Sequence, residues 1–573
     1  MTCRSIISDE RIDDVPLLVY WLLEMHIDKI IDAVLGPPHG NWQGLSYGQL
    51  AVVFIAYILT ECNHFLSPVR DWVLARRGCL SHALGQPIRD TDFTDDRLEA
   101  LLDAIGSAEV EEQIEMHLGQ HLIRAYALPT DTGRIDTTSV SVYHQPKGQG
   151  RLSFGHSKDR RPNLRQFKAV LSTLDPAGMP LCSAMVDGQC ADDPLYLPTW
   201  HRMVEIIGHT DFLAVGDCKM ASLETRAQIH RGGGWYLTPL PLTGDVPDDL
   251  RRLVLSPPVT PVDVYLPQVA QDAPPLGQGF EVGASRRWSD PQSGECVTWE
   301  ERVLVVRSDK LARRQQRGLA ERLSHAEKAL SKVKPGPDAD LVSLTVQSQA
   351  ILKRYRVGDY LRVTWTPYTT QTRRYLKRGR HGPNSPFEIV TTTRWQLALE
   401  RQTEAIETFN RLAGWRLYVT NAPAWRLDLS GAVACYREQW QPERGFHRLK
   451  GIPLAIRPLL LRTDRRIGGL LCILVIALRA LTLLEFVARR NLEQQPEPLQ
   501  GLYAGNSKRA TSRPTAERLL KAFDGITLYR LGDGQTTWYE VTPLSALQRR
   551  ILGLLGIPES VYTQLAKPLL VSP

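Results

Sequence analysis

Apolar residues recur at helical spacing through the first part of the chain. Residues 15–35 follow this pattern, and Gly36 with the prolines after it ends the predicted helix. A second helix is expected to begin after Ser46, which with Gln49 three residues later forms a capping box. More helical pattern follows, so the sequence predicts a helical N-terminal domain over residues 1–125, suited to binding DNA ends or to assembly.

From residue 130 the apolar pattern changes to that of short β-strands. Five strands are expected, at residues 133–143, 166–175, 179–187, 211–217 and 234–238. Helices are expected after the third and the fourth strand. The order predicts an α/β domain that begins at residues 130–243 and lacks its last helix there.

The second half of the chain supplies the missing parts. Strand-like pieces and a charged helix, expected to be exposed, fill residues 244–410, which we interpret as a β-rich insertion. The core is expected to resume over residues 411–495, and a small tail to occupy residues 496–573. Further elements are predicted as an exposed helix at 311–333, a strand at 415–421, a buried apolar helix at 467–487 and a helix capped by Ser545 at 545–555.

One predicted helix concentrates functional groups on a single face. An α-helix turns about 100° per residue, so offsets of 0, 3, 7 and 14 share a narrow stripe. In the run 436–450 those offsets are Tyr436, Gln439, Glu443 and Lys450, with Arg444 and Arg448 close by in the sequence. Such a face would bring a metal-binding carboxylate up to a phosphate backbone.

Two further carboxylates stand at strand positions. Asp136 lies near the start of the first core strand, and Asp217 ends the fourth. An acid at the carboxyl end of a buried strand is displayed at the open edge of its sheet. Each of these acids alone is as well explained by a turn or a helix cap, so the ordered set of three carries the argument.

The ordered set Asp136, Asp217 and Glu443 resembles that of the DDE transposases of bacterial insertion sequences. The resemblance is closest to the branch with a Tyr-Arg-Glu-Lys signature, the insertion sequence four family. It spans roughly residues 15–490, and its most specific blocks are residues 157–164 and 443–450. The arginine position of the signature holds Gln439, and Pro442 marks a helix start or kink inside the run.

The resemblance implies a fold and a chemistry. The fold would be a mixed five-stranded sheet of the RNase H type with flanking helices, interrupted by the β-rich insertion. Three converging carboxylates can hold two divalent ions, here Mg²⁺ with Mn²⁺ as a substitute, for phosphoryl transfer. The protein would cut DNA at transposon ends and join the freed 3′-hydroxyl to target DNA. The metal ligands would be Asp136, Asp217 and Glu443, and the DNA-binding residues Tyr436, Gln439, Arg444, Arg448, Lys450, Lys158, Arg160 and Arg161.

The implied partners are double-stranded DNA, both terminal inverted repeats and target, and a second copy of the chain in a synaptic homodimer. Two alternatives remain open: a transposase-derived DNA-binding protein without catalysis, and a metal-dependent nuclease that only cuts. Trp288, Trp299 and Trp365 are candidates for stacking an unstacked base, although core packing is the more common role of tryptophan.

Charge and cysteine content agree with this picture. The 573 residues carry a net charge of +7, and cationic side chains cluster at residues 157–165 and 373–381. Phosphate attracts such clusters, although a solvated loop explains each one equally well. The nine cysteines are dispersed without a Cys-x-x-Cys pair, which favours a reducing compartment.

The apolar run from residue 467 is too short to span a bilayer comfortably. We therefore expect a cytoplasmic, nucleoid-associated bacterial protein without membrane contact.

Overall fold

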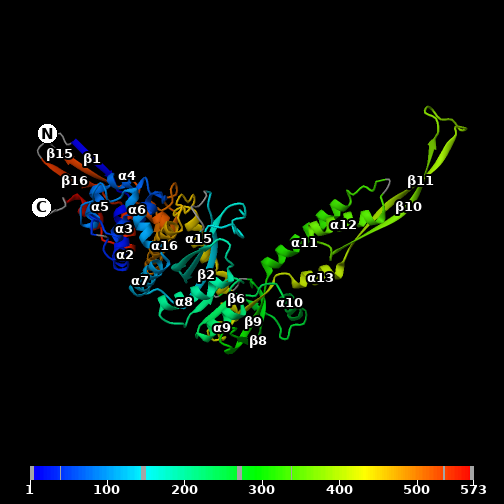
Figure 1. The fold of residues 1–573 in the computed structure, drawn as a ribbon, viewed down its shortest axis with the longest axis horizontal. Helices are drawn as coiled ribbons and strands as arrows, with labels where there is room; N and C mark the ends of the chain where they lie inside the picture. The colour runs from blue at the N-terminus through cyan, green and yellow to red at the C-terminus, as the bar shows by residue number, and fades with distance from the viewer. Residues whose placement is uncertain are drawn as a thin grey trace. The chain divides into compact units, whose positions relative to one another are not determined.

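The computed structural model describes residues 5–38, 40–143, 150–266, 274–336, 339–532 and 536–567 (Figure 1). The chain forms two compact units. The first contains Met1–Thr238, Arg286–Trp299 and Cys435–Pro573. The second contains Pro239–Ser285 and Glu300–Ala434.

Helices form the N-terminal part of the first unit. They are α1 (Val15–Glu24), α2 (Ile27–Leu35), α3 (Tyr47–Glu61), α4 (Val69–Leu74), α5 (Arg77–Leu84), α6 (Asp95–Ile105) and α7 (Ala108–Tyr126). The capping box of Ser46 and Gln49 at the start of α3 is confirmed. The single helix predicted over residues 15–35 is wrong: α1 ends at Glu24, and His26 takes a left-handed conformation (φ 57°) before α2 begins.

Five neighbouring strands of a larger mixed sheet belong to the first unit. These strands are β2 (Thr132–Ser141), β3 (Gln166–Leu174), β4 (Met179–Asp187), β5 (Leu213–Val215) and β6 (Trp235–Pro239), in the order β4-β3-β2-β5-β6. β2, β3 and β4 pair antiparallel, whereas β5 is parallel to both β2 and β6. The predicted succession of three strands, helix, strand, helix and strand is confirmed, because η1 (Asp193–Leu195) with α8 (Tyr196–Ile207) and α9 (Leu223–Arg231) fill the helix positions.

The apolar helix predicted at residues 467–487 is the longer α16 (Asp464–Glu493), capped by Thr463. It packs against β4, α3, α6 and α15 (Trp440–Lys450). By length and composition α16 could cross a membrane, but its most apolar stretch is entirely buried inside the protein. The expectation of a buried core helix is therefore confirmed.

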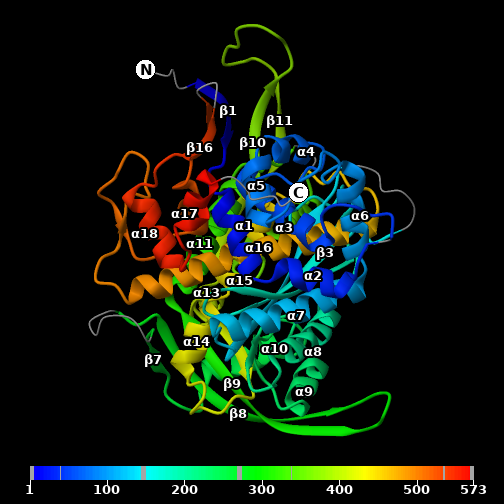
Figure 2. The same cartoon turned by 90° about the vertical axis from the view of Figure 1, so that its left-hand side faces the viewer.

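The C-terminal segment returns to the N-terminal helices (Figure 2). It consists of β13 (Leu499–Gln500), β14 (Ala510–Thr511), α17 (Ala516–Lys521), β15 (Thr527–Gly532), β16 (Thr537–Val541), α18 (Ala546–Leu555), α19 (Ser560–Thr563) and η2 (Gln564–Ala566). β15 pairs on one side with β16 and on the other with β1 (Ser5–Arg11). Ser545 caps α18 as predicted, in a second capping box.

The second unit combines a sheet with a separate two-stranded ribbon. Its elements are α10 (Val246–Leu255), β7 (Val262–Val264), most of β8 (Gly277–Ser289) and β9 (Cys296–Ser308), α11 (Asp309–Leu330), α12 (Leu341–Tyr355), β10 (Leu361–Tyr375), β11 (Phe387–Arg401), α13 (Thr403–Leu412), β12 (Trp415–Thr420) and the start of α14 (Leu429–Arg437). β12, β9, β8 and β7 neighbour one another in that order, and β10 with β11 forms the ribbon.

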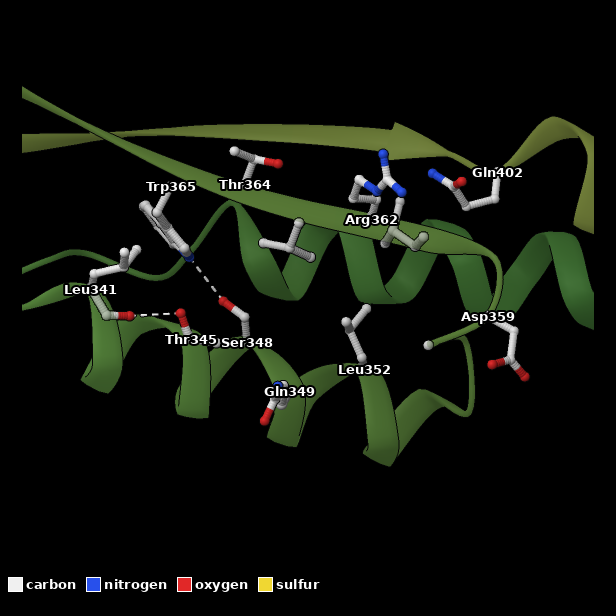
Figure 3. Close-up of a pocket in the computed structure, with 13 residues that line it drawn as sticks. Leu341, Thr345, Ser348, Gln349, Leu352, Asp359, Arg362, Thr364, Trp365 and Gln402 are labelled. Atoms are coloured by element: carbon white, nitrogen blue, oxygen red, sulfur yellow. Dashed lines mark hydrogen bonds between the residues drawn. The ribbon is translucent and has the colours of Figure 1, made fainter.

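The base of the ribbon packs on α11 and α12. Leu319, Leu323 and Leu330 of α11 are buried there with Leu361 of β10. The expectation of a fully exposed helix at residues 311–333 is therefore wrong for one face of α11. A groove of about 590 Å³ runs between α12 and β10, with Trp365 donating a hydrogen bond to Ser348 at one end (Figure 3).

Candidate active site

The strand register places two of the predicted carboxylates at the same level of the sheet. β2 and β5 run parallel, and Arg134 of β2 is paired with Val215 of β5. Asp136 and Asp217 each stand two residues further along. Neighbouring strands lie about 4.8 Å apart, so these two acids occupy adjacent positions at the edge where β5 ends.

The third carboxylate, Glu443, comes from helix α15, which packs against β2 and β3. Gly445 allows this close approach, since a Cβ atom there would lie 3.2 Å from the Leu171 side chain. Leu171 is the cross-strand partner of Asp136. The helix is therefore seated over the strand pair that carries Asp136, with Glu443 exposed in its first turn.

The pKa of Asp136 shows that the three acids share one electrostatic environment. Burial raises the pKa of Asp136 to about 6, the Lys158 ammonium and the Thr137 N–H oppose the rise, and the charges of Asp217 and Glu443 add to it. Lys158 Nζ lies 3.9 Å from Asp136 Oδ1. A half-buried carboxylate whose charge is opposed by two others is a candidate position for a bound cation.

Asp217 is oriented by neighbours on both sides. Its Oδ1 atom accepts hydrogen bonds from the Tyr196 hydroxyl (2.6 Å) and from the Lys219 backbone N–H (2.9 Å). Gly216 keeps the turn close to Tyr196, because a Cβ atom there would lie 2.9 Å from that ring. Burial and the charge of Asp217 raise the pKa of Tyr196, which remains a hydrogen-bond donor.

Two residues beside this edge were missed by the sequence reasoning. Asp192, the residue before η1, accepts a hydrogen bond from Lys168 (2.7 Å) and lies 3.4 Å from Lys158 Nζ. Burial alone would raise the pKa of Asp192, but the ammonium groups of Lys168 and Lys158 hold this pKa below its usual range. Asp192 precedes the 3-10 turn η1 and Tyr196 begins α8, so the i, i+4 spacing of one α-helix does not relate them and the sequence carried no signal for the pair.

The predicted single helix over residues 436–450 is wrong. α14 ends at Arg437 and α15 begins at Trp440, with Gln439 as the residue before its first turn. Tyr436 and Glu443 therefore lie on different helices, and the stripe of four side chains does not exist as one face. Pro442 falls in the first turn of α15, where a missing N–H costs little.

Buried Arg134, also missed by the sequence reasoning, ties the α14–α15 junction to the sheet. Arg134 forms two hydrogen bonds with Asp175 (2.7 and 2.6 Å), and it donates to the Cys435 carbonyl (2.8 Å) and to Gln439 Oε1 (3.4 Å). It precedes Asp136 by two residues on the same strand, so both side chains point to the same face. Gln439 thus contacts the protein's own arginine.

The predicted DNA-binding arginines of α15 face the protein interior. Arg448 is buried and pairs with Glu485 of α16 and with both carboxylate oxygens of Glu517 of α17 (2.7 and 3.0 Å). Arg444 pairs with the same Glu485 at 2.5 Å. These two arginines anchor α15 on α16 and α17.

The remaining predicted cations lie on or near the surface. Lys450 Nζ and Arg457 Nη1 hold the two oxygens of Asp159 at 2.9 and 3.1 Å, and burial lowers the pKa of Lys450. Lys158 donates to the carbonyl and the hydroxyl of Thr137, both at 2.6 Å. Arg160 and Arg161 are exposed.

The three carboxylates are the kind of ligand that a divalent cation prefers, but their side chains do not lie close enough together to coordinate one. Carboxylate oxygens are the ligands that Mg²⁺ prefers, and a cation would relieve the repulsion that raises the pKa of Asp136. Within the described residues, however, no three His, Cys, Asp or Glu side chains gather closely enough to hold a metal ion. Coordination would require these side chains to turn towards one another.

The candidate tryptophans are packed to different degrees. Trp299 is buried, donates a hydrogen bond to the Tyr236 hydroxyl and packs with Trp288, which is half-buried. Trp365 is buried against Ser348 in the second unit. Core packing, the common role of tryptophan, is confirmed for Trp299 and Trp365.

Comparison with curated proteins gives no match. Among solved structures, the chain is similar to the piggyBac transposase in a synaptic complex with hairpin DNA, at 11% identity and a TM-score of 0.25, over 49% of this chain and 60% of that one. The chain thus matches about three fifths of that protein's length. Residues 129–479 match the family described as the transposase DDE domain. This range is more than half of the chain and includes Asp136, Asp217 and Glu443, so the protein belongs to the transposase DDE domain family.

Proposed function

We propose that this protein is a DNA transposase of the insertion-sequence type, which cuts DNA at element ends and transfers the freed strand to target DNA. One observation carries the proposal. Asp136, Asp217 and Glu443 come from distant parts of the family-matched range, yet the strand register sets Asp136 beside Asp217, and α15, which carries Glu443, packs on β2. Three such carboxylates are the donor set that two-metal phosphoryl transfer needs.

The core is proposed to be of the RNase H type. The strand order β4-β3-β2-β5-β6, with three antiparallel strands followed by two parallel ones, supports this assignment. We further propose that residues 244–410 are an insertion between core parts 130–243 and 411–495, flanked by an N-terminal domain (1–125) and a tail (496–573). The insertion sequence four family remains the proposed branch, supported by the block 443–450.

Each acid has a proposed task at the metal site. Asp136, Asp217 and Glu443 would each supply carboxylate oxygens to the Mg²⁺ ions. Bound ions would supply charge stabilisation to the attacking and leaving oxygens. Tyr196 orients Asp217, while Lys158 balances the charge of Asp136 and can meet a phosphate beside it.

The proposed partners are duplex DNA, both element ends and target, and a second copy of the chain. Lys158, 3.9 Å from Asp136, and the exposed Arg160 and Arg161 that follow it in the chain are proposed to contact DNA phosphates. Lys450 and Arg457 both form ion pairs with the Asp159 carboxylate. A DNA phosphate could bind these two cations by taking the place of that carboxylate.

The test is Mg²⁺-dependent cleavage and joining of duplexes that carry the DNA flanking the gene. Asp136→Asn and Glu443→Gln should abolish both reactions, whereas the control Asp131→Asn, at an exposed acid before β2, should retain them. Mg²⁺ should also raise the Tm of the wild type and not that of Asp136→Asn. DNA binding without cleavage by the wild type would favour a non-catalytic DNA-binding protein, and cleavage without joining would favour a nuclease.

A further inference from the structure

Two lysines and an aspartate form a connected set beside the proposed metal ligands. Lys158 Nζ is close to two carboxylates, at 3.9 Å from Asp136 Oδ1 and 3.4 Å from Asp192 Oδ2. Lys168 Nζ donates a hydrogen bond to the other oxygen of Asp192 at 2.7 Å. Lys158 thus links Asp136, a proposed metal ligand, to Asp192, to which no metal role has been assigned.

The ion pair of Lys168 and Asp192 is fixed in place. Lys168 lies on β3, opposite Ser139 of β2, and its side chain is 8% exposed. Its ammonium also donates to the Cys190 carbonyl, so it is held at two points. Because a buried ammonium without a carboxylate partner is costly, this pair is a permanent part of the sheet edge.

Lys158 combines an anchored backbone with a long, partly exposed side chain. Its backbone N–H donates to the Ser139 hydroxyl at 3.3 Å, which ties the residue to β2. Its side chain is 32% exposed, and its ammonium is nearer to two oxygens of Thr137, at 2.6 Å, than to either carboxylate. Lysine carries a compact charge on a flexible four-carbon stem. Rotation of that stem can therefore move the ammonium between the two carboxylates while the backbone stays in place.

The present position of the Lys158 ammonium conflicts with a metal ion on Asp136. Mg²⁺ binds carboxylate oxygens at about 2.1 Å, so an ion on Asp136 Oδ1 would lie no more than about 6 Å from Lys158 Nζ. Positive charges at that separation repel each other strongly where little water screens them. Without a metal, by contrast, the ammonium offsets part of the negative charge of the acids. Lys158 and a metal ion therefore compete for the same carboxylate.

We propose that Lys158 is the counter-cation of the metal-free site, and that Asp192, fixed by Lys168, receives its ammonium when a divalent ion takes the place beside Asp136. This inference rests on the proposed function, since it assumes that the three acids bind metal. Asp192 and Lys168 act as positioning residues, because they influence metal binding through Lys158. In the proposed reaction, the displaced ammonium would then be free to meet the DNA phosphate that enters beside the metal.

Three variants test this exchange. Lys158→Met removes the ammonium and keeps the length of the side chain. Asp192→Asn removes the carboxylate charge and keeps the shape, and the double variant combines both changes. The matched control is Asp193→Asn, which removes the same charge one residue along the chain, from a side chain that is 51% exposed and pairs with Lys219.

The probe is Mn²⁺, titrated into the full chain without DNA, with the free ion counted by electron paramagnetic resonance. Lys158→Met should bind Mn²⁺ about three- to tenfold more tightly than the wild type, because a unit charge near the divalent ion is gone. Asp192→Asn should bind it about three- to tenfold more weakly, because Asp136 is then the carboxylate left to Lys158. Asp193→Asn should stay within about twofold of the wild type, as expected for an exposed ion pair.

The double variant distinguishes this exchange from simpler roles of Asp192. If Asp192 acts through Lys158, Asp192→Asn should change Mn²⁺ affinity by less than about twofold once residue 158 is methionine. An equal loss in both backgrounds would show that Asp192 is itself a ligand or only a nearby negative charge, and would overturn the inference. Unchanged or weaker Mn²⁺ binding by Lys158→Met would also overturn it, and this result does not depend on whether Asp192→Asn folds.

The wild type separates this inference from the proposed function. A wild type that binds no Mn²⁺ and cuts no DNA counts against the proposed function. A wild type that binds Mn²⁺ and cuts DNA, with variants that bind the ion as it does, counts against the exchange alone. Unchanged circular dichroism shows that each variant is folded.

Discussion

At the scale of single residues, the acids of the sheet edge differ in how they are held. Asp217 is fixed by the Tyr196 hydroxyl and a backbone N–H. Asp136 accepts the Thr137 N–H and has Lys158 at 3.9 Å. Tyr196 is therefore proposed as a positioning residue, since its hydroxyl sets the orientation in which Asp217 would meet the proposed cation.

Tyr196→Phe should raise the Mg²⁺ concentration required for half-maximal cleavage by about 10- to 100-fold, because partners of metal ligands contribute that much to affinity. The matched control is Tyr57→Phe, since the Tyr57 hydroxyl is buried and has no hydrogen-bond partner among the described residues. A Mg²⁺ titration of both variants decides the matter. Equal requirements in Tyr196→Phe and wild type would refute the role.

The residue scale also shows what a pattern can predict. The adjacency of Asp136 and Asp217 follows from parallel strands, which the alternation of strand and helix already implies. The roles of Arg134, Tyr196 and Glu517 could not be predicted in this way. Their partners lie far away in the chain, and only the folded arrangement brings Arg134 to Cys435 or Arg448 to Glu517.

At the scale of elements, helix α15 is held by charge on one side and by close packing on the other. Arg444 and Arg448 bind Glu485, which Arg489 also approaches at 3.2 Å and to which Ala516 donates its N–H. Burial alone would lower the pKa of Arg448, but the carboxylates of Glu485 and Glu517 raise this pKa above its usual value. The helix that carries Glu443 thus depends on α16 and α17.

Arg448→Lys should lower the free energy of unfolding by about 2–4 kcal/mol, because lysine cannot reach both glutamates and leaves buried charge unpaired. Arg437→Lys, at an exposed arginine that ends α14, should change it by less than about 0.5 kcal/mol. Denaturant unfolding measures both. A stable Arg448→Lys protein with weakened DNA binding would instead support direct phosphate contact by Arg448.

Element boundaries were predictable where a side chain marks them. Ser46 and Ser545 mark the starts of helices α3 and α18 in the sequence, and both capping boxes are present in the structure. The break at His26 was not predictable from apolar spacing, which continues across it, whereas Pro442 marked the helix start that the structure places at Trp440. The buried face of α11 was signalled by the spacing of Leu319, Leu323 and Leu330, but charged neighbours obscured it.

At the scale of the molecule, a buried ionic cluster joins four elements of the first unit. Glu115 of α7 binds Arg202 of α8 at 2.5 Å, Arg479 of α16 at 3.3 Å and Ser183 of β4. Glu111 contacts the same serine. Burial and the charge of Glu115 raise the pKa of Glu111 to about 8, so the cluster holds one proton at neutral pH.

The proton on Glu111 makes stability depend on pH. Folding raises this pKa from 4.5 to about 8, so the folded state binds the extra proton. The stabilisation that this proton gives to the folded state is fully present below pH 4.5 and is lost as the pH rises through 8. Glu111→Gln should remove this slope and be the more stable protein above pH 8, by on the order of 1 kcal/mol or more.

Unfolding curves of wild type and Glu111→Gln from pH 5 to 9 test this expectation. Glu109→Gln, at an exposed acid in the first turn of the same helix, is the control and should retain the wild-type slope. Parallel curves for wild type and Glu111→Gln would show that Glu111 does not hold the proton.

The pairing of β1 with β15 has a consequence in time. Arg11 pairs with Thr527, about 515 residues later in the chain, and the Tyr562 hydroxyl binds the Asp13 carbonyl. Synthesis at roughly 5–20 residues per second leaves β1 without its partner for about 25 to 100 s. Glu517, which holds Arg448, emerges just as late. The helix that carries Glu443 therefore gains the support of Glu517 only after about 70 further residues have been synthesised.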